Sequence, residues 1–183
     1  MIIGITGTIG AGKGAIVDYL VRKKGFTHYS MSGFLTEELR RRNLPLLREN
    51  MHLVADEIRK EHGPGYLVEF HLDKAHVTGN NTVIESIRSL GEVEALKKEP
   101  NSILLAVDAD VKTRYQRILN RKSSKDMVSF EKFVEAEQSE SVQKEIWAMN
   151  LVGCMQLAEF VIKNNGSMSD LYKQVDAILE KIK

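Results

Sequence analysis

A glycine-rich segment near the start of the chain has the residue types and the spacing needed to bind phosphate. It has the spacing G-x-x-x-x-G-K and reads Gly7-Thr8-Ile9-Gly10-Ala11-Gly12-Lys13-Gly14. Glycines let backbone N–H groups turn inward around phosphate oxygens, and a lysine adds a mobile positive charge. We therefore expect residues 7–14, together with Ala15, to bind ATP, and Lys13 to act in catalysis.

The sequence on either side of this segment supports the same prediction. Residues 1–6 form an apolar run suited to a short buried strand, and Ile16, Val17 and Leu20 lie on one face of a predicted helix over residues 15–24. A strand, a glycine-rich turn and a helix N-terminus together form a phosphate-binding loop, because the unpaired N–H groups and the helix dipole attract phosphate. The alternative, an ordinary glycine-rich turn, is disfavoured by the complete spacing and the lysine.

The residue after Lys13 narrows the class of loop. Many phosphate-binding loops place Ser or Thr there, and its hydroxyl ligates Mg²⁺. This chain has Gly14 instead, so we expect Mg²⁺ to be held by phosphate oxygens and water. The sequence resembles the G-x-G-K-G loop of adenylate kinases and other nucleoside monophosphate kinases, except that Ala15 stands where those enzymes usually have Thr.

Composition limits the classes of partner and compartment. The 183 residues, 43% of them hydrophobic, suffice for one domain over residues 1–183, and the net charge of +1 gives no sign of nucleic acid or membrane as a partner. A single cysteine, Cys154, excludes an internal disulfide and is expected to be a buried structural thiol in a reducing cytoplasm. The apolar N-terminal run is too short for a signal or membrane helix. The oligomeric state is left open.

Strands and helices are expected to alternate along the rest of the chain. Four further strands are predicted at residues 27–30, 82–85, 103–107 and 160–162. These runs show little alternation of polar and apolar residues, as in strands covered on both faces. Helices are predicted from a cap at Asp110 and from a cap at Ser169. The pattern predicts an α/β fold of three layers, with a five-stranded parallel sheet between helices.

Two longer segments interrupt this alternation. Residues 31–78 have a helical pattern broken at Gly63-Pro64-Gly65, and residues 121–150 are polar and then helical. Ligands in open α/β sheets bind beyond the carboxyl ends of the strands, where inserted segments shape or close the pocket. We therefore predict an acceptor-side insert at 31–78 and a lid at 121–150.

Glu85 and Arg88 lie at the end of a predicted central strand, where they should face the same cleft as Lys13. A carboxylate there can hold Mg²⁺ through water, and an arginine can bridge the donor and acceptor phosphates. We expect Glu85 to act in the outer shell of the metal and Arg88 in catalysis. A helix cap for Glu85 and a surface ion pair for Arg88 are the alternatives.

A group of arginines lies ahead of the predicted lid. Arg114, Arg117 and Arg121 share one helical face. Arginines brought in by a closing lid neutralise the negative charge that develops in phosphoryl transfer, so we assign Arg117 and Arg121 to catalysis. A solvated basic helix is the alternative. The run at residues 40–42 is interpreted as a solvated face, and the five histidines show no metal-binding spacing.

Across nearly the whole chain, these features resemble the nucleoside monophosphate and dephospho-CoA kinase group of P-loop kinases. Residues 3–10, 107–121 and 158–166 are similar to dephospho-CoA kinases, and the resemblance implies that the last loop, with Asn165, lies near the adenine of ATP. The segment from Glu85 to Arg88 resembles the D-G-x-P-R segment of adenylate kinases, with Glu for Asp and no proline. The segments around residues 63–64 and 87–94 are also similar to an uncharacterised archaeal family of kinase-like proteins.

Two departures from these families bear on the acceptor. Dephospho-CoA kinases have an aspartate base after the second strand, and nucleoside monophosphate kinases have a G-D-x-x-R segment that grips the acceptor. This chain has Gly33 and Thr36 at those positions. A hydroxyl acceptor then lacks an evident base, whereas a monophosphate is already ionised.

We therefore predict ATP- and Mg²⁺-dependent phosphoryl transfer to a small nucleotide-like acceptor, a nucleoside or deoxynucleoside monophosphate. Dephospho-CoA is the alternative acceptor. A nucleotide-binding switch or weak ATPase without an acceptor is the alternative from another class, although the chain has no D-x-x-G segment of the kind that GTPases use.

Overall fold

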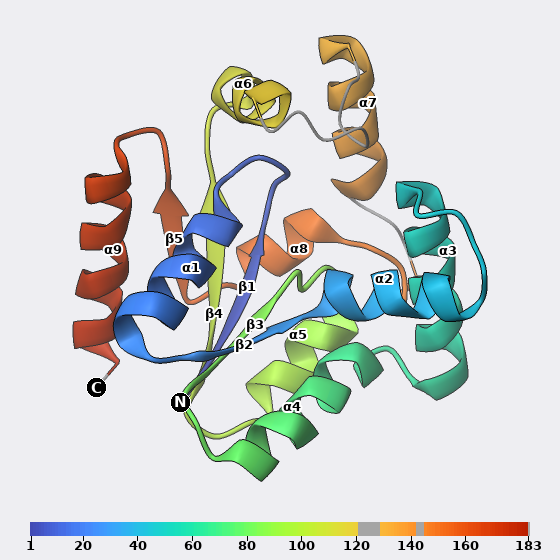
Figure 1. Ribbon diagram of the computed structural model, residues 1–183, viewed down its shortest axis with the longest axis horizontal. Coiled ribbons are helices and arrows are strands. Elements are labelled where there is room, and N and C mark those ends of the chain that lie inside the picture. The colour runs from blue at the N-terminus through green and yellow to red at the C-terminus, as the bar shows by residue number, and fades with distance from the viewer. Residues whose placement is uncertain (121–128, 142–144, 183) are drawn as a thin grey trace.

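The computed structural model describes residues 1–120, 129–141 and 145–182, and its centre is a parallel sheet (Figure 1). The strands are β1 (Ile2–Gly7), β2 (Thr27–Ser30), β3 (Thr82–Glu85), β4 (Ser102–Asp108) and β5 (Phe160–Lys163), in the order β2-β3-β1-β4-β5. Each neighbouring pair is parallel. The predicted α/β fold with a five-stranded parallel sheet is confirmed, and the strand bounds agree to within a residue or two.

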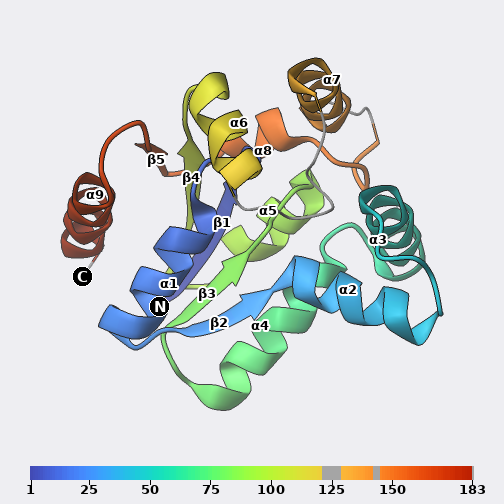
Figure 2. The same ribbon diagram turned by 45° about the horizontal axis from the view of Figure 1, so that its top comes forward.

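Helices cover both faces of the sheet. The first layer contains α1 (Lys13–Lys24) and α9 (Met168–Lys181), and the opposite layer contains α4 (Tyr66–Thr78), α5 (Leu90–Lys97) and α8 (Leu151–Gln156) (Figures 1 and 2). Beyond the strand ends lie α2 (Met31–Arg41), α3 (Arg48–His62), α6 (Val111–Asn120) and α7 (Phe130–Ser141). The helices α2 to α4 occupy the insert predicted at residues 31–78.

Two hydrophobic cores lie on the two faces of the sheet because successive strand residues point in opposite directions. Ile3 and Ile5 of β1 pack in the core with α1 and α9. Ile2 packs in the other core, which includes Cys154 of α8. Cys154 is fully buried, and this burial raises the pKa of its thiol to about 12. The expected structural thiol is confirmed.

One glycine of β1 is required by this packing. A Cβ on Gly4 would lie 2.3 Å from Cδ2 of Leu96 and 2.6 Å from Cδ1 of Ile87. Only a residue without a side chain allows α5 and the segment after β3 to approach β1 this closely. The end of β3, where two predicted site residues lie, is therefore held against the strand that leads into the phosphate-binding loop.

The caps of the first and last helices show one correct and one wrong prediction. The first helix ends at Gly25, as predicted, and this glycine is left-handed with φ 74°. The final helix is capped by Ser167, not by Ser169. The Ser167 side chain accepts a hydrogen bond from the backbone N–H of Asp170, and the Asp170 carboxylate accepts one from the backbone N–H of Ser167. The predicted cap lies inside the first turn.

The predicted lid at residues 121–150 includes the helix α7, and its residues 121–128 and 142–144 lie outside the described part of the chain. Buried Phe133 of α7 packs with Ile9 and with Ile118 of α6, beside the phosphate-binding loop. Its role as a lid stays a prediction. Within the described ranges, every helix is too short or too polar to cross a membrane.

Candidate active site

The loop between β1 and α1 has the backbone conformation of a phosphate cradle. Gly7, Gly10 and Gly12 have φ values of 138°, 77° and 107°, a region that side chains disfavour. Gly12 forms the N-terminal boundary of α1, so the first N–H groups of that helix face the loop. The cradle is therefore formed by the backbone itself.

Lys13 lies across this loop. Its Nζ donates hydrogen bonds to the carbonyl oxygens of Gly7, at 2.7 Å, and of Thr8, at 2.9 Å. The side chain of Thr8 donates a 3.0 Å hydrogen bond to Oδ1 of Asp108 at the end of β4. Burial raises the pKa of Asp108, but the hydrogen bonds from Lys163 and Thr8 outweigh it, so its pKa is lowered. An ionised carboxylate thus anchors the loop to the neighbouring strand.

Two further side chains brace the loop through the carbonyl of Ala11. Asn164, which is buried, donates a 2.7 Å hydrogen bond from Nδ2 to the carbonyl of Ala11. A Cβ on Gly12 would lie 2.3 Å from the same Nδ2. Arg117 donates to the carbonyls of Ala11, at 3.4 Å, and of Asn164, at 2.9 Å. Asn165 instead pairs with Asp110, which accepts from Nδ2 at 3.0 Å.

These contacts place the predicted residues without assigning their chemistry. Arg117 and Asn164 contact the carbonyl of Ala11 in the loop, and Arg121 lies outside the described residues. The adenine contact of Asn165 and the catalytic roles of Arg117 and Arg121 stay predictions. The neighbouring Arg114 is buried and forms an ion pair with Glu137 of α7, which ties the helix α6 to the predicted lid.

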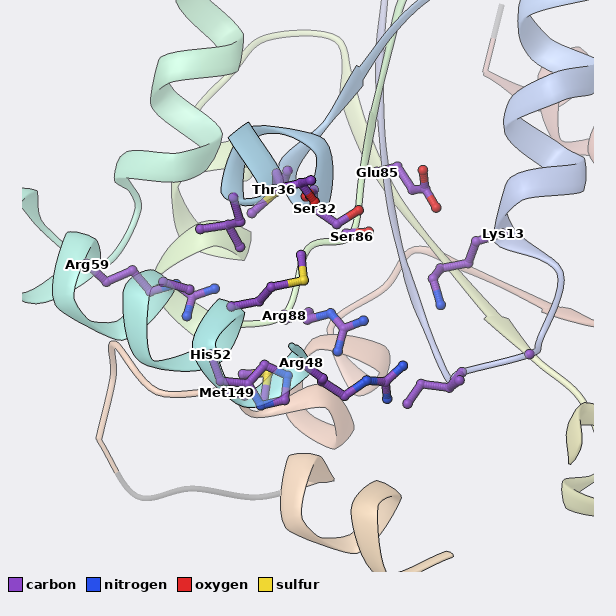
Figure 3. Close-up of a pocket in the computed structure, with 16 residues that line it drawn as sticks. Lys13, Ser32, Thr36, Arg48, His52, Arg59, Glu85, Ser86, Arg88 and Met149 are labelled. Atoms are coloured by element: carbon purple, nitrogen blue, oxygen red, sulfur yellow. The ribbon is translucent and has the colours of Figure 1, made fainter. Parts of the chain in front are cut away.

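A pocket of about 310 Å³ opens beside the loop, a volume within the range of small-molecule sites. Lys13 and Glu85, which sequence reasoning placed in one cleft, both line it, and so does Arg88 (Figure 3). The strand register explains this, because Glu85 pairs with Ile5 of β1 and with Ser30 of β2 at the same edge of the sheet.

The carboxylate of Glu85 is ionised in this environment. Its Oε2 lies 3.2 Å from Nε2 of His28 on the adjacent strand. Burial alone raises the pKa of Glu85, but the hydrogen bond and charge of His28, with the charges of Lys13 and Arg88, make the net shift downward. Glu85 is therefore suited to hold a cation near the loop, and its outer-shell role toward Mg²⁺ stays a prediction.

The residues after Glu85 form a rigid connection that carries Arg88. Ser86 adopts a left-handed conformation with φ 79°, which is uncommon for a residue with a side chain. The backbone N–H of Arg88 donates to Oε2 of buried Glu92 at 2.8 Å, and its carbonyl accepts from the backbone N–H of Asn150 at 2.9 Å. Arg88 is thus held on both sides of its backbone.

Glu92 also links this connection to the helix α3. It caps α5 together with Ser89, and its Oε1 accepts a 2.9 Å hydrogen bond from Nε of Arg59. The side chains of Arg59 and Glu92 are 2% and 0% exposed. A buried ion pair of this kind fixes the position of α3 relative to the end of β3, since either charge alone would be costly to bury.

Sequence reasoning missed the contribution of α3 to the pocket. Arg48, His52, Ala55 and Arg59 line it from one face of this helix, at spacings of four, three and four residues. This spacing of residues in the sequence could have indicated that they share one face of a helix.

The two positions at which the chain departs from the kinase families lie on α2. Gly33 donates its N–H to the capping Ser30. Thr36 lines the pocket and donates its hydroxyl to the carbonyl of Ser32.

The loop fits the predicted nucleotide and metal only in part. The cradle and Lys13 suit a triphosphate, whereas Gly14 offers no ligand to Mg²⁺, and a Cβ there would meet nothing within 4 Å. Among the described residues, no group of three His, Cys, Asp or Glu side chains is placed to hold a metal. The protein can therefore contribute Glu85, through water, to a cation that phosphate oxygens bind directly.

Nearly the whole chain, including this site, is similar to known proteins. A family model described as an AAA domain matches residues 3–148. A UPF0200 protein of Methanocaldococcus jannaschii is 31% identical over 190 residues, covering 100% of this chain and 90% of the relative. One of Staphylothermus marinus is 30% identical over 181 residues, covering 99% and 92%.

Solved structures with low sequence identity share the fold. TT1252 from Thermus thermophilus superposes with a TM-score of 0.65 at 20% identity, and the superposition covers 100% of this chain and 98% of that one. Shikimate kinase from Acinetobacter baumannii, in complex with shikimate, superposes with a TM-score of 0.60 at 15% identity, over 100% of this chain and 94% of that one. The fold is that of P-loop kinases.

Proposed function

The chain belongs to the UPF0200 family and to the AAA-domain family, and from this premise we propose that it transfers the γ-phosphoryl group of ATP to a nucleoside or deoxynucleoside monophosphate. The observation that carries the proposal is the shared pocket: the phosphate-binding lysine Lys13 and the strand-end residues Glu85 and Arg88 line one cavity. Donor and acceptor phosphates therefore have room to meet beside the loop.

The donor side supports a triphosphate substrate. The backbone N–H groups of residues 7–14 and the ammonium of Lys13 stabilise the phosphate chain, and the N-terminus of α1 adds its dipole. Lys13 already lies over the loop, bonded to Gly7 and Thr8, so binding exchanges those carbonyl partners for phosphate oxygens. Mg²⁺, when bound, would neutralise charge on the transferred group, with Glu85 contacting its water shell.

The acceptor side favours a group that is already ionised. Within the described part of the chain, Glu85 is the only carboxylate that lines the pocket. Its pKa is lowered, and it is paired with His28, so it is a weak base for a hydroxyl group. Position 33 offers no side chain. A monophosphate brings an anionic oxygen as nucleophile and needs no proton removed, and Arg88 screens the repulsion between the two phosphates.

Two other functions remain as competitors. Dephospho-CoA would present a hydroxyl, and the weak basicity of Glu85 argues against it. A nucleotide-binding switch would need no acceptor, and the cationic pocket beside Lys13, lined by Arg48 and Arg88, argues against that class.

A coupled assay of ADP release tests the proposal. We expect nucleoside monophosphates from a panel of ribo- and deoxynucleotides to accelerate ADP release with ATP and Mg²⁺, and dephospho-CoA to do so poorly. Arg88→Lys should lose about tenfold or more of this stimulation, because an ammonium cannot make the bidentate contact. Stimulation by dephospho-CoA alone would establish the other acceptor, and slow ADP release with no stimulation would establish the switch.

A further inference from the structure

The walls of the pocket divide into a cationic part and an apolar part. Figure 3 shows the ends of Arg48, Arg88 and Lys13 directed into the same space at one side of the cavity. Three methionines also line the cavity, namely Met31 of α2, Met51 of α3 and Met149 from the segment before α8. One cavity thus presents both a charged and an apolar surface to its occupant.

The cationic side chains that line this pocket come from α1, α3 and the segment after β3, and they belong to different parts of the site. The charge of Arg59 is matched by Glu92 and by Asp56, which accepts a 3.1 Å hydrogen bond from it. Lys13 is bonded to the carbonyls of the loop and belongs to the donor side. Arg48 and Arg88 approach the cavity from different elements, α3 and the segment after β3. Two guanidinium groups that reach the same space from different elements are placed to hold one anionic group.

Arg48 also supplies what the sequence lacks at its expected acceptor position. Thr36, where the resemblance places a gripping arginine, donates its hydroxyl to the carbonyl of Ser32. Arg48 lies on the next helix, and its guanidinium enters the cavity from there (Figure 3). The backbone of Arg88 is fixed by Glu92, so the distance between the two arginines depends on α3, which Arg59 ties to the same glutamate.

The apolar side chains of the pocket suit a flat ring. Met31 and Met149 are buried, and Leu35 and Ala55 are buried beside them. Thioethers are polarisable and contact aromatic rings favourably, and their unbranched chains adapt to a planar group. A small polyol would leave these side chains without matching apolar surface, whereas a nucleobase would cover them.

We infer that Arg48 and Arg88 form a two-armed clamp for the acceptor's phosphate, and that Met31, Met51 and Met149 hold the acceptor's base. This inference rests on the proposed function for the direction of transfer, but the clamp is a binding site in its own right. It names the acceptor class as a molecule with an anionic phosphate and a planar heterocycle on a short spacer, which matches a nucleoside monophosphate.

Calorimetry with the donor site filled tests the clamp. The full chain is saturated with Mg²⁺ and a non-hydrolysable ATP analogue and then titrated with a panel of nucleoside 5′-monophosphates. We expect Arg48→Gln to weaken their binding by about 10- to 100-fold, as for loss of a charge-assisted contact, and Arg48→Lys to lose less. Arg41→Gln is the control, because Arg41 is an exposed arginine that pairs with Glu38 on α2 outside the pocket.

The contact of the methionines with the base is tested with a ligand that lacks the base. We expect ribose 5-phosphate to bind about tenfold or more weakly than the tightest monophosphate of the panel, because it lacks the base. Equal binding of ribose 5-phosphate, equal behaviour of the Arg48→Gln and Arg41→Gln variants, or no binding by any monophosphate would overturn the inference. Thermal unfolding of each variant confirms that it is folded.

Turnover separates this inference from the proposed function. Binding that depends on Arg48, without formation of any diphosphate, would support the clamp and defeat the proposed reaction. Diphosphate formation with an unchanged KM for the monophosphate in Arg48→Gln would support the reaction and defeat the clamp.

Discussion

The proposed donor and acceptor sides of this pocket are built in different ways. The donor side is one continuous segment, residues 7–14, whose shape comes from backbone conformation at three glycines. The acceptor side is assembled from α2, α3, the end of β3 and the segment before α8, and its shape comes from side chains. A continuous backbone site is visible in the sequence as a motif, whereas a discontinuous side-chain site appears only when the fold brings its parts together.

The two sides also differ in what holds them. Lys13, Asn164 and Arg117 donate hydrogen bonds to carbonyl oxygens of the phosphate-binding loop. The hydroxyl of Thr8 in the loop donates a further hydrogen bond to the carboxylate of Asp108. In the proposed acceptor side, a buried ion pair between Arg59 and Glu92 joins α3 to the segment after β3. Damage to a single residue should therefore disturb the acceptor side more than the donor side. The following substitutions test this difference, from the largest expected effect to the smallest.

Glu92→Ala should have the largest effect on stability. It leaves the buried guanidinium of Arg59 without its main partner and removes the cap of α5, so we expect unfolding to become easier by about 3–5 kcal/mol. Urea denaturation measures this change. Glu57→Ala is the control, because Glu57 is 59% exposed in its ion pair with Arg42 and should cost less than about 1 kcal/mol. Similar losses in the two variants would show that the buried pair does not hold the acceptor side.

Lys13→Ala should damage the donor side without unfolding it. We expect ATP affinity to fall by about 2–3 kcal/mol, the scale of a lost charge-assisted contact, because the backbone cradle remains. Calorimetry with Mg²⁺ and ATP measures the affinity, and circular dichroism checks the fold. Lys23→Ala, at an exposed position in the last turn of α1, serves as control. A folded Lys13→Ala variant that binds ATP normally would contradict the assignment of the loop.

Gly14→Ser should have the smallest effect, and it should raise the affinity for ATP instead of lowering it. A Cβ at this position meets nothing within 4 Å, and the added hydroxyl is a potential Mg²⁺ ligand. We expect ATP affinity to rise by about 1 kcal/mol with Mg²⁺ and to stay unchanged without it. Gly14→Ala is the control, since it adds the same carbon and no hydroxyl. If Ser and Ala behaved alike in Mg²⁺, the metal would not lie within reach of this position.

The same contrast explains how much the sequence predicted. The loop, the five strands and the shared location of Glu85 and Lys13 follow from short apolar runs, a fixed spacing and the rule that parallel strands end at one edge. The spacing of Arg48 and His52 on one helical face and the S-x-x-E cap of Ser89 were readable signals that remained unused.

Other features had no local signal. At left-handed Ser86, the backbone N–H groups of Ser86 and Ile87 both donate to the carbonyl of Ile5, a contact that is distant in sequence. No pattern distinguishes the buried Asn164 from the exposed Asn165 beside it. The misplaced cap of the last helix has a simple cause. Both Ser167 and Ser169 are capping residues by type, and only Ser167 has an acidic residue three positions later.

The most direct test of the central claim follows the transferred group. The full chain is incubated with Mg²⁺, ATP labelled in the γ-phosphate and, in separate reactions, each nucleoside monophosphate or dephospho-CoA, and the labelled products are separated. The account predicts label in a nucleoside diphosphate, with little or none formed by the Lys13→Ala variant. Label found only in orthophosphate with every monophosphate, or found in dephospho-CoA's product alone, would contradict it.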